Sequence, residues 1–241
     1  MKQTIPFHVE GVRMIAHRGL SGLELQNTNA AFVAAANRSY FGIETDIHVT
    51  KDGCFAVIHD DTTENVSDTV LTVEESTLAE LRALSLRKKD GETRGDLIVP
   101  TLSEYAAICR DYGKVSVLEL KNPFEKADIE RVVAILKEMD QFEHTIFISF
   151  CFDNLVRLRE VDPTCNVQYL RKTVESVDEL LAKAAEHHFD LDLHSGMITK
   201  ELVSRAHELG ILINVWTVDS TDTAKRVAEA GVDFITTNIL E

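Results

Sequence analysis

The second half of the chain decides the fold, beginning with Thr145-Ile-Phe-Ile-Ser149, a short apolar run that is followed by the helical pattern Asp153–Val161. The same alternation then continues almost to the last residue. The later apolar runs are Asn166-Val-Gln-Tyr169, Asp190-Leu-Asp-Leu193, Ile211-Leu-Ile-Asn-Val215 and Asp233-Phe-Ile-Thr236. Short apolar runs separated by amphipathic helical stretches indicate repeated strand–helix units around a parallel sheet.

The same rhythm extends toward the N-terminus. The earlier apolar runs are Arg13-Met-Ile-Ala-His17, Gly42-Ile-Glu-Thr-Asp-Ile-His-Val49 and Val115-Ser-Val-Leu-Glu-Leu120. We interpret Cys54–Ile58 as a short extra strand that follows the turn Lys51-Asp-Gly53. With that strand set aside, the repeats predict an α/β fold, a TIM (β/α)8 barrel. A doubly wound sheet is the alternative, but it usually opens with a Gly-rich phosphate loop, and none follows the first run.

Residues 60–100 interrupt the rhythm with a polar stretch that contains one predicted helix, Val73–Leu84. We interpret this stretch as a small insertion between the second and third barrel strands, within a single domain that spans residues 1–241. Lys88 and Lys89 are expected on its surface.

Composition excludes several classes of function. The chain has 241 residues and carries 25 Lys and Arg against 40 Asp and Glu, a formal net charge of −15. This charge argues against nucleic acid or an anionic membrane surface as the main partner. No apolar run approaches the length of a membrane span, and the first ten residues do not resemble a secretion signal. The four scattered cysteines predict reduced thiols in a cytoplasmic protein.

Charged residues gather where the first barrel strands are expected to end. Glu44 and Asp46 are two residues apart, as are Glu119 and Lys121, and alternation along a strand places each pair on one face. Three carboxylates that converge from neighbouring strands repel one another unless a cation lies between them. Oxygen ligands favour one divalent cation, Mg2+ or Ca2+, over zinc.

Two histidines flank the same rim of the predicted barrel. His17 ends the first strand, and His59 follows the extra strand. A pair of imidazoles on either side of a phosphoryl group can act as general base and general acid near neutral pH. Arg18 and Lys121 would supply fixed positive charge for phosphate. Trp216, the only tryptophan, is interpreted as a substrate contact, with core packing as the alternative.

Over nearly its whole length the chain resembles the glycerophosphodiester phosphodiesterases. The matching segments are Ala16-His-Arg-Gly19, Asn27-Thr28 followed by Ala31-Phe32, Ile43-Glu-Thr-Asp-Ile47, Thr50-Lys-Asp-Gly53, His59-Asp60, Val99-Pro-Thr-Leu102, Leu118-Glu-Leu-Lys121, Val215-Trp-Thr-Val218 and Gly231-Val-Asp233. Each tripeptide alone is weak evidence of kinship, but their order and spacing together are highly specific.

The resemblance implies metal-dependent hydrolysis of glycerophosphodiesters to glycerol 3-phosphate and an alcohol, through a cyclic phosphate. It implies that Glu44, Asp46 and Glu119 bind the divalent cation, and that His17 and His59 form the acid/base pair. The substrate would be a small molecule, with no nucleic acid and no stable membrane association. The head-group alcohol, the choice between Mg2+ and Ca2+ and the oligomeric state stay open at this point.

Two alternatives remain beside this interpretation. One is a phospholipase of related barrel type that acts on intact lipid, although residues 60–100 contain no aromatic residue for membrane contact. The other is a non-catalytic phosphoglycerol-binding protein. Two departures from the family pattern leave room for the second: Gln26 replaces the usual Glu, and Asn65 stands in a segment where Arg-Thr-Thr is common. A third departure is Asn238, which replaces Asp. We expect none of the three to touch the proposed ligands or histidines.

Overall fold

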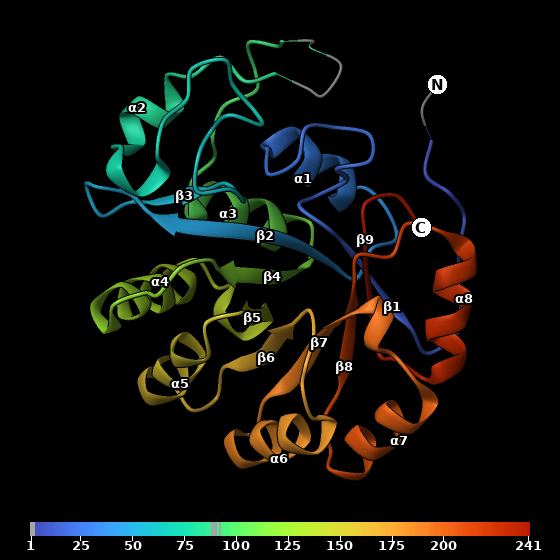
Figure 1. Ribbon diagram of the computed structural model, residues 1–241. Helices are drawn as coiled ribbons and strands as arrows, with labels where there is room; N and C mark the ends of the chain where they lie inside the picture. The colour runs from blue at the N-terminus through green and yellow to red at the C-terminus, as the bar shows by residue number, and fades with distance from the viewer. Residues whose placement is uncertain (1–2, 88–90, 92) are drawn as a thin grey trace.

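The computed structural model, which describes residues 3–87, 91 and 93–241, is a closed barrel of parallel strands surrounded by helices (Figure 1). Its sheet has the strand order β1-β9-β8-β7-β6-β5-β4-β2-β3, and β1 also pairs with β2, which closes the ring. Among the pairs of named strands, only β3 with β2 is antiparallel. The predicted TIM barrel is therefore confirmed, and the doubly wound alternative is wrong.

The elements alternate as the sequence pattern predicts. The strands are β1 (Arg13–Ala16), β2 (Gly42–Val49), β3 (Phe55–Val57), β4 (Val115–Leu120), β5 (Thr145–Ser149), β6 (Asn166–Arg171), β7 (Asp190–His194), β8 (Ile213–Trp216) and β9 (Phe234–Thr237). The helices are α1 (Asn29–Ala36), α2 (Leu78–Arg82), α3 (Leu102–Asp111), α4 (Lys126–Glu138), α5 (Phe152–Val161), α6 (Val177–His187), α7 (Lys200–Glu208) and α8 (Thr221–Ala230), with short 3-10 turns η1 (Val73–Glu75), η2 (Phe142–His144) and η3 (Ser195–Met197).

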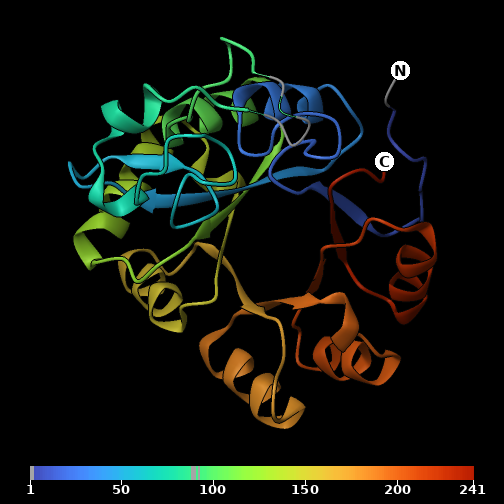
Figure 2. The same ribbon diagram turned by 45° about the horizontal axis from the view of Figure 1, so that its top comes forward.

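The described residues between β3 and α3 (58–87, 91 and 93–101) lie over one side of the barrel, where Figure 2 shows α2 outside β2 and β3. They enclose a small apolar cluster of their own that includes Val73 and Leu81. The helix predicted over Val73–Leu84 is wrong in its extent, because the structure has the separate pieces η1 and α2 there. Thr77 explains the break: it adopts an extended conformation and forms a capping box with Glu80 at the start of α2. The expected surface position of Lys88 and Lys89 lies outside the described residues.

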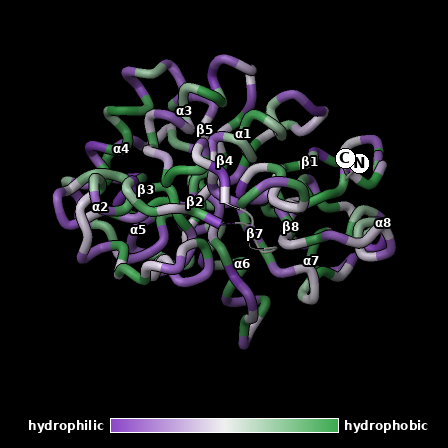
Figure 3. The backbone as a smooth tube through the Cα atoms, turned by 90° about the horizontal axis from the view of Figure 1, so that it is seen from above, coloured by the Kyte–Doolittle hydropathy of each residue, from purple (hydrophilic) through white to green (hydrophobic). Residues whose placement is uncertain are grey.

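The barrel itself has two further apolar clusters. Most buried apolar side chains lie between the outer face of the barrel and its helices, which alternate between hydrophobic and hydrophilic colour along their length in Figure 3. A smaller apolar cluster lies in the barrel interior; it includes Ile15, Val117, Ile148, Leu170 and Phe234. The buried polar side chains of Gln168, Asn214 and Thr236 share this face and hydrogen-bond to one another.

In the described part of the chain, each helix is too short or too polar to cross a membrane.

Candidate active site

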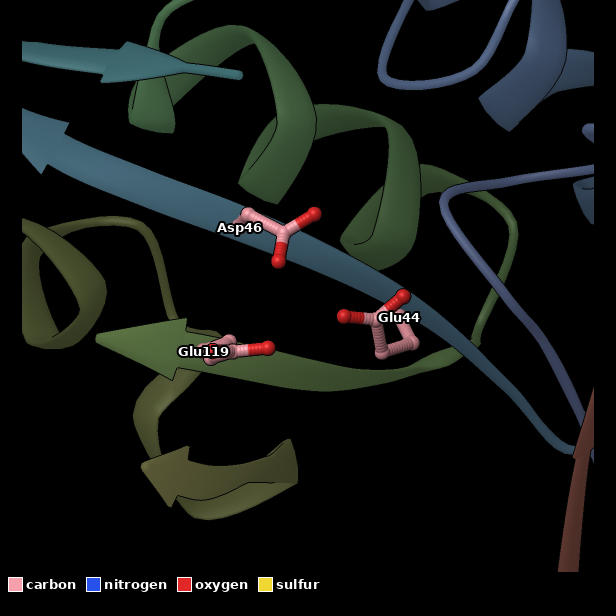
Figure 4. Close-up of side chains that lie close together, drawn as sticks. All are labelled: Glu44, Asp46 and Glu119. Carbon is pink, nitrogen blue, oxygen red and sulfur yellow. The ribbon is translucent and has the colours of Figure 1, made fainter. Parts of the chain in front are cut away.

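Three carboxylates meet at the carboxyl ends of β2 and β4. The register pairs Asp46 with Glu119 across the two strands, and alternation along β2 turns Glu44 to the same side (Figure 4). One oxygen from each of the three lies within 4.8 Å of the others. Glu44 is 3%, Asp46 0% and Glu119 6% exposed, so this negative charge is shielded from water.

The electrostatics show that the cluster holds more negative charge than its protein surroundings balance. Burial and the adjacent Asp46 raise the pKa of Glu44 well above its usual value, and the same two causes raise the pKa of Glu119 to about 8. Burial opposes ionisation of Asp46 as well, but Lys121 and Arg18 outweigh it and hold the pKa of Asp46 below its usual range. A cation between the three groups would allow all of them to ionise.

The oxygen atoms of the cluster fit a hard divalent cation. Asp46 Oδ1 is buried and accepts no hydrogen bond from any described residue, and its cationic neighbour Lys121 Nζ lies 3.5 Å away. Lys121 Nζ also lies 2.9 Å from Glu119 Oε1. Carboxylate oxygens without other donors are the ligands that Mg2+ and Ca2+ prefer. The arrangement can therefore hold such an ion, with Lys121 at its edge.

Arg18 reaches the cluster through an unusual backbone conformation. Its φ of 55° is left-handed, a region that non-glycine residues seldom adopt and that is enriched at functional sites. This conformation lets Arg18 N donate to Glu44 Oε2 at 2.8 Å, while the guanidinium Nε lies 3.5 Å from Asp46 Oδ2. Gly19 follows with φ 72° directly against Ala31, where a side chain would not fit.

His17 is fixed by Asn238, the residue that follows the last strand of the barrel. Its Nδ1 lies 2.8 Å from Asn238 Oδ1, and Asn238 in turn donates from Nδ2 to Asp219. Because the amide oxygen can only accept, His17 carries its hydrogen on Nδ1 and its lone pair on Nε2. Nε2 lies 4.0 Å from Glu44 Oε2. Burial and then the neighbouring Arg18 lower the pKa of His17 to about 4, so the ring is neutral at pH 7.

His59 is fixed by a carboxylate instead of an amide. Its Nδ1 lies 2.5 Å from Asp60 Oδ1, and Asn65 donates to the other oxygen of Asp60 at 2.8 Å. Burial lowers the pKa of His59, while Asp46 and the hydrogen bond to Asp60 act in the opposite direction. The two histidines therefore stand in different environments, although the sequence presents them alike.

A cavity of about 880 Å³ opens beside the two histidines. Its wall includes His17, Arg18 and His59, together with Gln26 and Asn65. The three carboxylates do not line it. A molecule bound in this cavity would therefore be able to contact both imidazoles and Arg18.

Trp216 lies at the end of β8 and is partly buried. Its Nε1 donates to the Asp192 carbonyl at 3.3 Å, and its ring packs edge-on against Phe150 and His194, with centroids 5.6 and 5.5 Å away. It also packs on the apolar cluster inside the barrel. Trp216 therefore has packing contacts, as the core-packing alternative expects. Its contact with substrate stays a prediction.

The expectation that none of the three departures touches the proposed ligands or histidines is wrong for Asn238. Gln26 and Asn65 touch none of those residues, but each holds a neighbour of the site. Asn238 hydrogen-bonds His17, Gln26 Oε1 accepts from Arg18 Nη1 at 2.9 Å, and Asn65 holds the aspartate that orients His59. The interpretation missed these contacts because the loops after different strands meet only at the rim of the folded barrel, and local pattern carries no signal for that.

Asn27 is a further residue that the sequence interpretation did not place in the site. The neighbouring Thr28 caps α1. Asn27 instead adopts φ 54° and donates from Nδ2 to Asp46 Oδ2 at 2.8 Å. The matching segment Asn27-Thr28 carried a signal for this role. Because Thr28 alone caps the helix, Asn27 is free for another function.

Comparison with known proteins identifies the family. The family model described as the glycerophosphoryl diester phosphodiesterase family matches residues 17–241. The chain belongs to this family. A glycerophosphodiester phosphodiesterase from Caldanaerobacter subterraneus subsp. tengcongensis is 31% identical over 229 residues, covering 93% of both chains. One from Bacillus altitudinis is 29% identical over 230 residues and covers 94% of both.

Solved structures agree with the fold. The crystal structure of a glycerophosphodiester phosphodiesterase from Parabacteroides distasonis superposes with a TM-score of 0.78 and 26% sequence identity, covering 98% of this chain and 94% of that one. The predicted enzyme class is therefore confirmed: the chain is a phosphoric diester hydrolase of the glycerophosphoryl diester phosphodiesterase family. Within that family, its buried carboxylates can hold a divalent metal.

Proposed function

We propose that this enzyme hydrolyses small, soluble glycerophosphodiesters to glycerol 3-phosphate and an alcohol, with one divalent cation, Mg2+ or Ca2+, held by Glu44, Asp46 and Glu119. The observation that carries the proposal is the buried carboxylate cluster near two histidines, each held through Nδ1, and two cations. When bound, the metal would supply positive charge for the phosphoryl oxygens and lower the pKa of a bound hydroxyl.

His17 acts as the general base in the first step. Its Nε2 lone pair faces the carboxylate cluster, and its pKa of about 4 keeps it unprotonated near neutral pH. It takes the proton of the glycerol 2-hydroxyl as that oxygen bonds to phosphorus.

His59 acts as the general acid in the same step. Asp60 accepts from its Nδ1 and stabilises the protonated ring, which leaves the Nε2–H for the departing alcohol oxygen. Bond formation by the 2-hydroxyl and loss of the alcohol give a cyclic phosphate. Water then opens the ring with the roles reversed: His59 takes the water proton, and His17 returns its proton to the 2-oxygen.

Arg18 and Lys121 bind the phosphate oxygens. Both already lie against the carboxylates, at 3.5 Å from Asp46, so their positions are fixed before substrate arrives. With the divalent cation, these two cations outweigh the three carboxylates. The local charge is therefore favourable to a phosphodiester anion despite the acidic chain.

The proposed compartment is the cytoplasm, with no stable membrane association. All four cysteines are unpaired in the structure, which supports a reducing environment. Residues 60–100 contain no aromatic residue that could anchor the rim in a bilayer.

A turnover screen tests the function. Several glycerophosphodiesters are incubated with Mg2+, Mn2+, Ca2+ or EDTA, and glycerol 3-phosphate and free alcohol are measured. We expect turnover with a divalent cation, none with EDTA, and loss of at least about 100-fold in His17→Ala and His59→Ala. Full activity in EDTA or in either variant would refute the proposal, and binding without turnover would favour a sensor protein.

A further inference from the structure

His48 is a fully buried histidine for which the proposed reaction has no role. It lies on β2, two residues beyond Asp46, and is 0% exposed. The hydrogen-bonded ladder between β2 and β3 continues to Ile58, whose N donates to the Asp46 carbonyl at 3.1 Å. The carbonyl of the following residue, His59, lies 3.2 Å from His48 Nε2. A side chain thus extends the ladder by one hydrogen bond.

The other ring nitrogen of His48 is clamped from the opposite side. His48 Nδ1 lies 3.2 Å from Glu74 Oε1 in η1. Asn122, which follows Lys121 at the end of β4, donates to the same oxygen at 2.8 Å and to Asp61 Oδ1 at 3.2 Å. The ring is therefore held between the carbonyl of His59 and a carboxylate that is itself fixed by the loop after β4.

We propose that His48 is a positioning residue for His59. A carbonyl oxygen can only accept, so His48 Nε2 donates to it and fixes the backbone of His59. Asp60 separately fixes the imidazole of His59 through Nδ1. The two contacts together define where Nε2 of His59 lies relative to the departing alcohol. This inference rests on the proposed role of His59 as general acid.

Backbone position matters here because proton transfer requires the donor within about 2.6–3.2 Å of the oxygen that receives the proton. A displacement of about 1 Å can reduce a rate by about 100-fold. The expected defect is specific: protonation of the alcohol suffers, whereas attack on phosphorus does not. A leaving group that needs no proton should therefore be insensitive to His48.

The experiment measures kcat/KM for two glycerophosphodiesters, one with an aliphatic alcohol and one with 4-nitrophenol as leaving group. The value of kcat/KM depends only on the steps from free enzyme and substrate to departure of the alcohol. In His48→Leu, we expect a loss of about 10- to 100-fold for the aliphatic diester and less than about 3-fold for the nitrophenyl diester. His48→Gln, whose amide can donate from nearly the same place, should recover most of the loss.

A second variant keeps the test valid if His48→Leu folds poorly. Glu74 is exposed, and Glu74→Ala should give the same selective loss, about 3- to 10-fold, because the ring of His48 loses its clamp. Glu75→Ala, its exposed neighbour in η1, is the matched control and should behave as wild type. The melting temperature of each variant shows whether it is folded at the temperature of the assay.

Equal losses on both diesters in His48→Leu, or wild-type kinetics in both His48→Leu and Glu74→Ala, would overturn the inference. The proposed function is judged separately. It fails if the wild-type enzyme with divalent cation hydrolyses neither diester. The role of His59 is judged by His59→Ala, which must itself show the selective loss on the aliphatic diester.

Discussion

Replacing Asp60 with asparagine should move the alkaline limb of the pH profile of kcat/KM to lower pH. A general acid must be protonated, so activity falls as pH rises through the pKa of His59. Burial lowers that pKa, and the 2.5 Å contact with Asp60 raises it again. Asp60→Asn keeps an oxygen that accepts from Nδ1 but removes the negative charge. The pKa of His59 should therefore fall further.

The size of the shift follows from the geometry. A nearby opposite charge shifts a pKa by about 1–3 units. Because the side chains of His59 and Asp60 are 29% and 30% exposed, water weakens the interaction and we expect the lower end, about 1 unit. Above the midpoint this corresponds to roughly a 10-fold loss of kcat/KM, whereas the loss below the midpoint is smaller.

The assay follows release of an aliphatic alcohol from about pH 5 to about pH 9 at saturating divalent cation, a range that brackets the ordinary pKa of histidine. Glu64→Gln removes a negative charge from an exposed position in the same segment and serves as the control. An alkaline limb that stays in place in Asp60→Asn, or that moves to higher pH, would refute the assignment of His59 as the acid oriented by Asp60.

Three further predictions concern the metal, the phosphate and the fold. Divalent cation at about 100 times its Kd should raise the melting temperature by roughly 5–10 °C in the wild type and far less in Glu119→Gln, as measured by differential scanning fluorimetry. Gln26→Glu, which gives Arg18 a charged partner in place of a neutral one, should raise KM about 3- to 10-fold, with a smaller difference at high salt; an unchanged KM would contradict the role of Arg18. Gly19→Ala places a Cβ 2.6 Å from backbone of Ala31 at φ 72°, so it should destabilise the fold by more than about 2 kcal/mol and lower the melting temperature by roughly 5 °C, checked by thermal unfolding.

The barrel was predictable because its signal is local and repeated. Each strand forms a short apolar run, and each helix carries an amphipathic pattern, so the order of elements follows from the sequence alone. Convergence of Glu44, Asp46 and Glu119 was predictable for a similar reason. Alternation along a strand fixes the face of each carboxylate, and parallel neighbours end at the same rim.

The supports of His17 and His48 were not predictable from local pattern. Asn238 lies 221 positions from His17 in the chain, and Glu74 lies 26 positions from His48. Their contacts depend on how loops from different strands fold over the rim, which hydrophobic periodicity does not encode. The capping box of Thr77 and Glu80 was a sequence signal that a helix begins at residue 78. The helical spacing of the leucines nearby favoured one longer helix instead.

The hydrogen bond between His17 and Asn238 makes activity depend on completion of the ring. The proposed base comes from the first barrel strand, and the group that sets its tautomer follows the last one. During synthesis, a nascent chain that ends before β9 would contain all three carboxylates and both imidazoles but would lack Asn238, the residue that orients the base. Catalysis would then switch on in a single event, when β9 docks beside β1. A phosphodiesterase assay would therefore report the fraction of chains that have closed the ring, not the fraction that have merely collapsed.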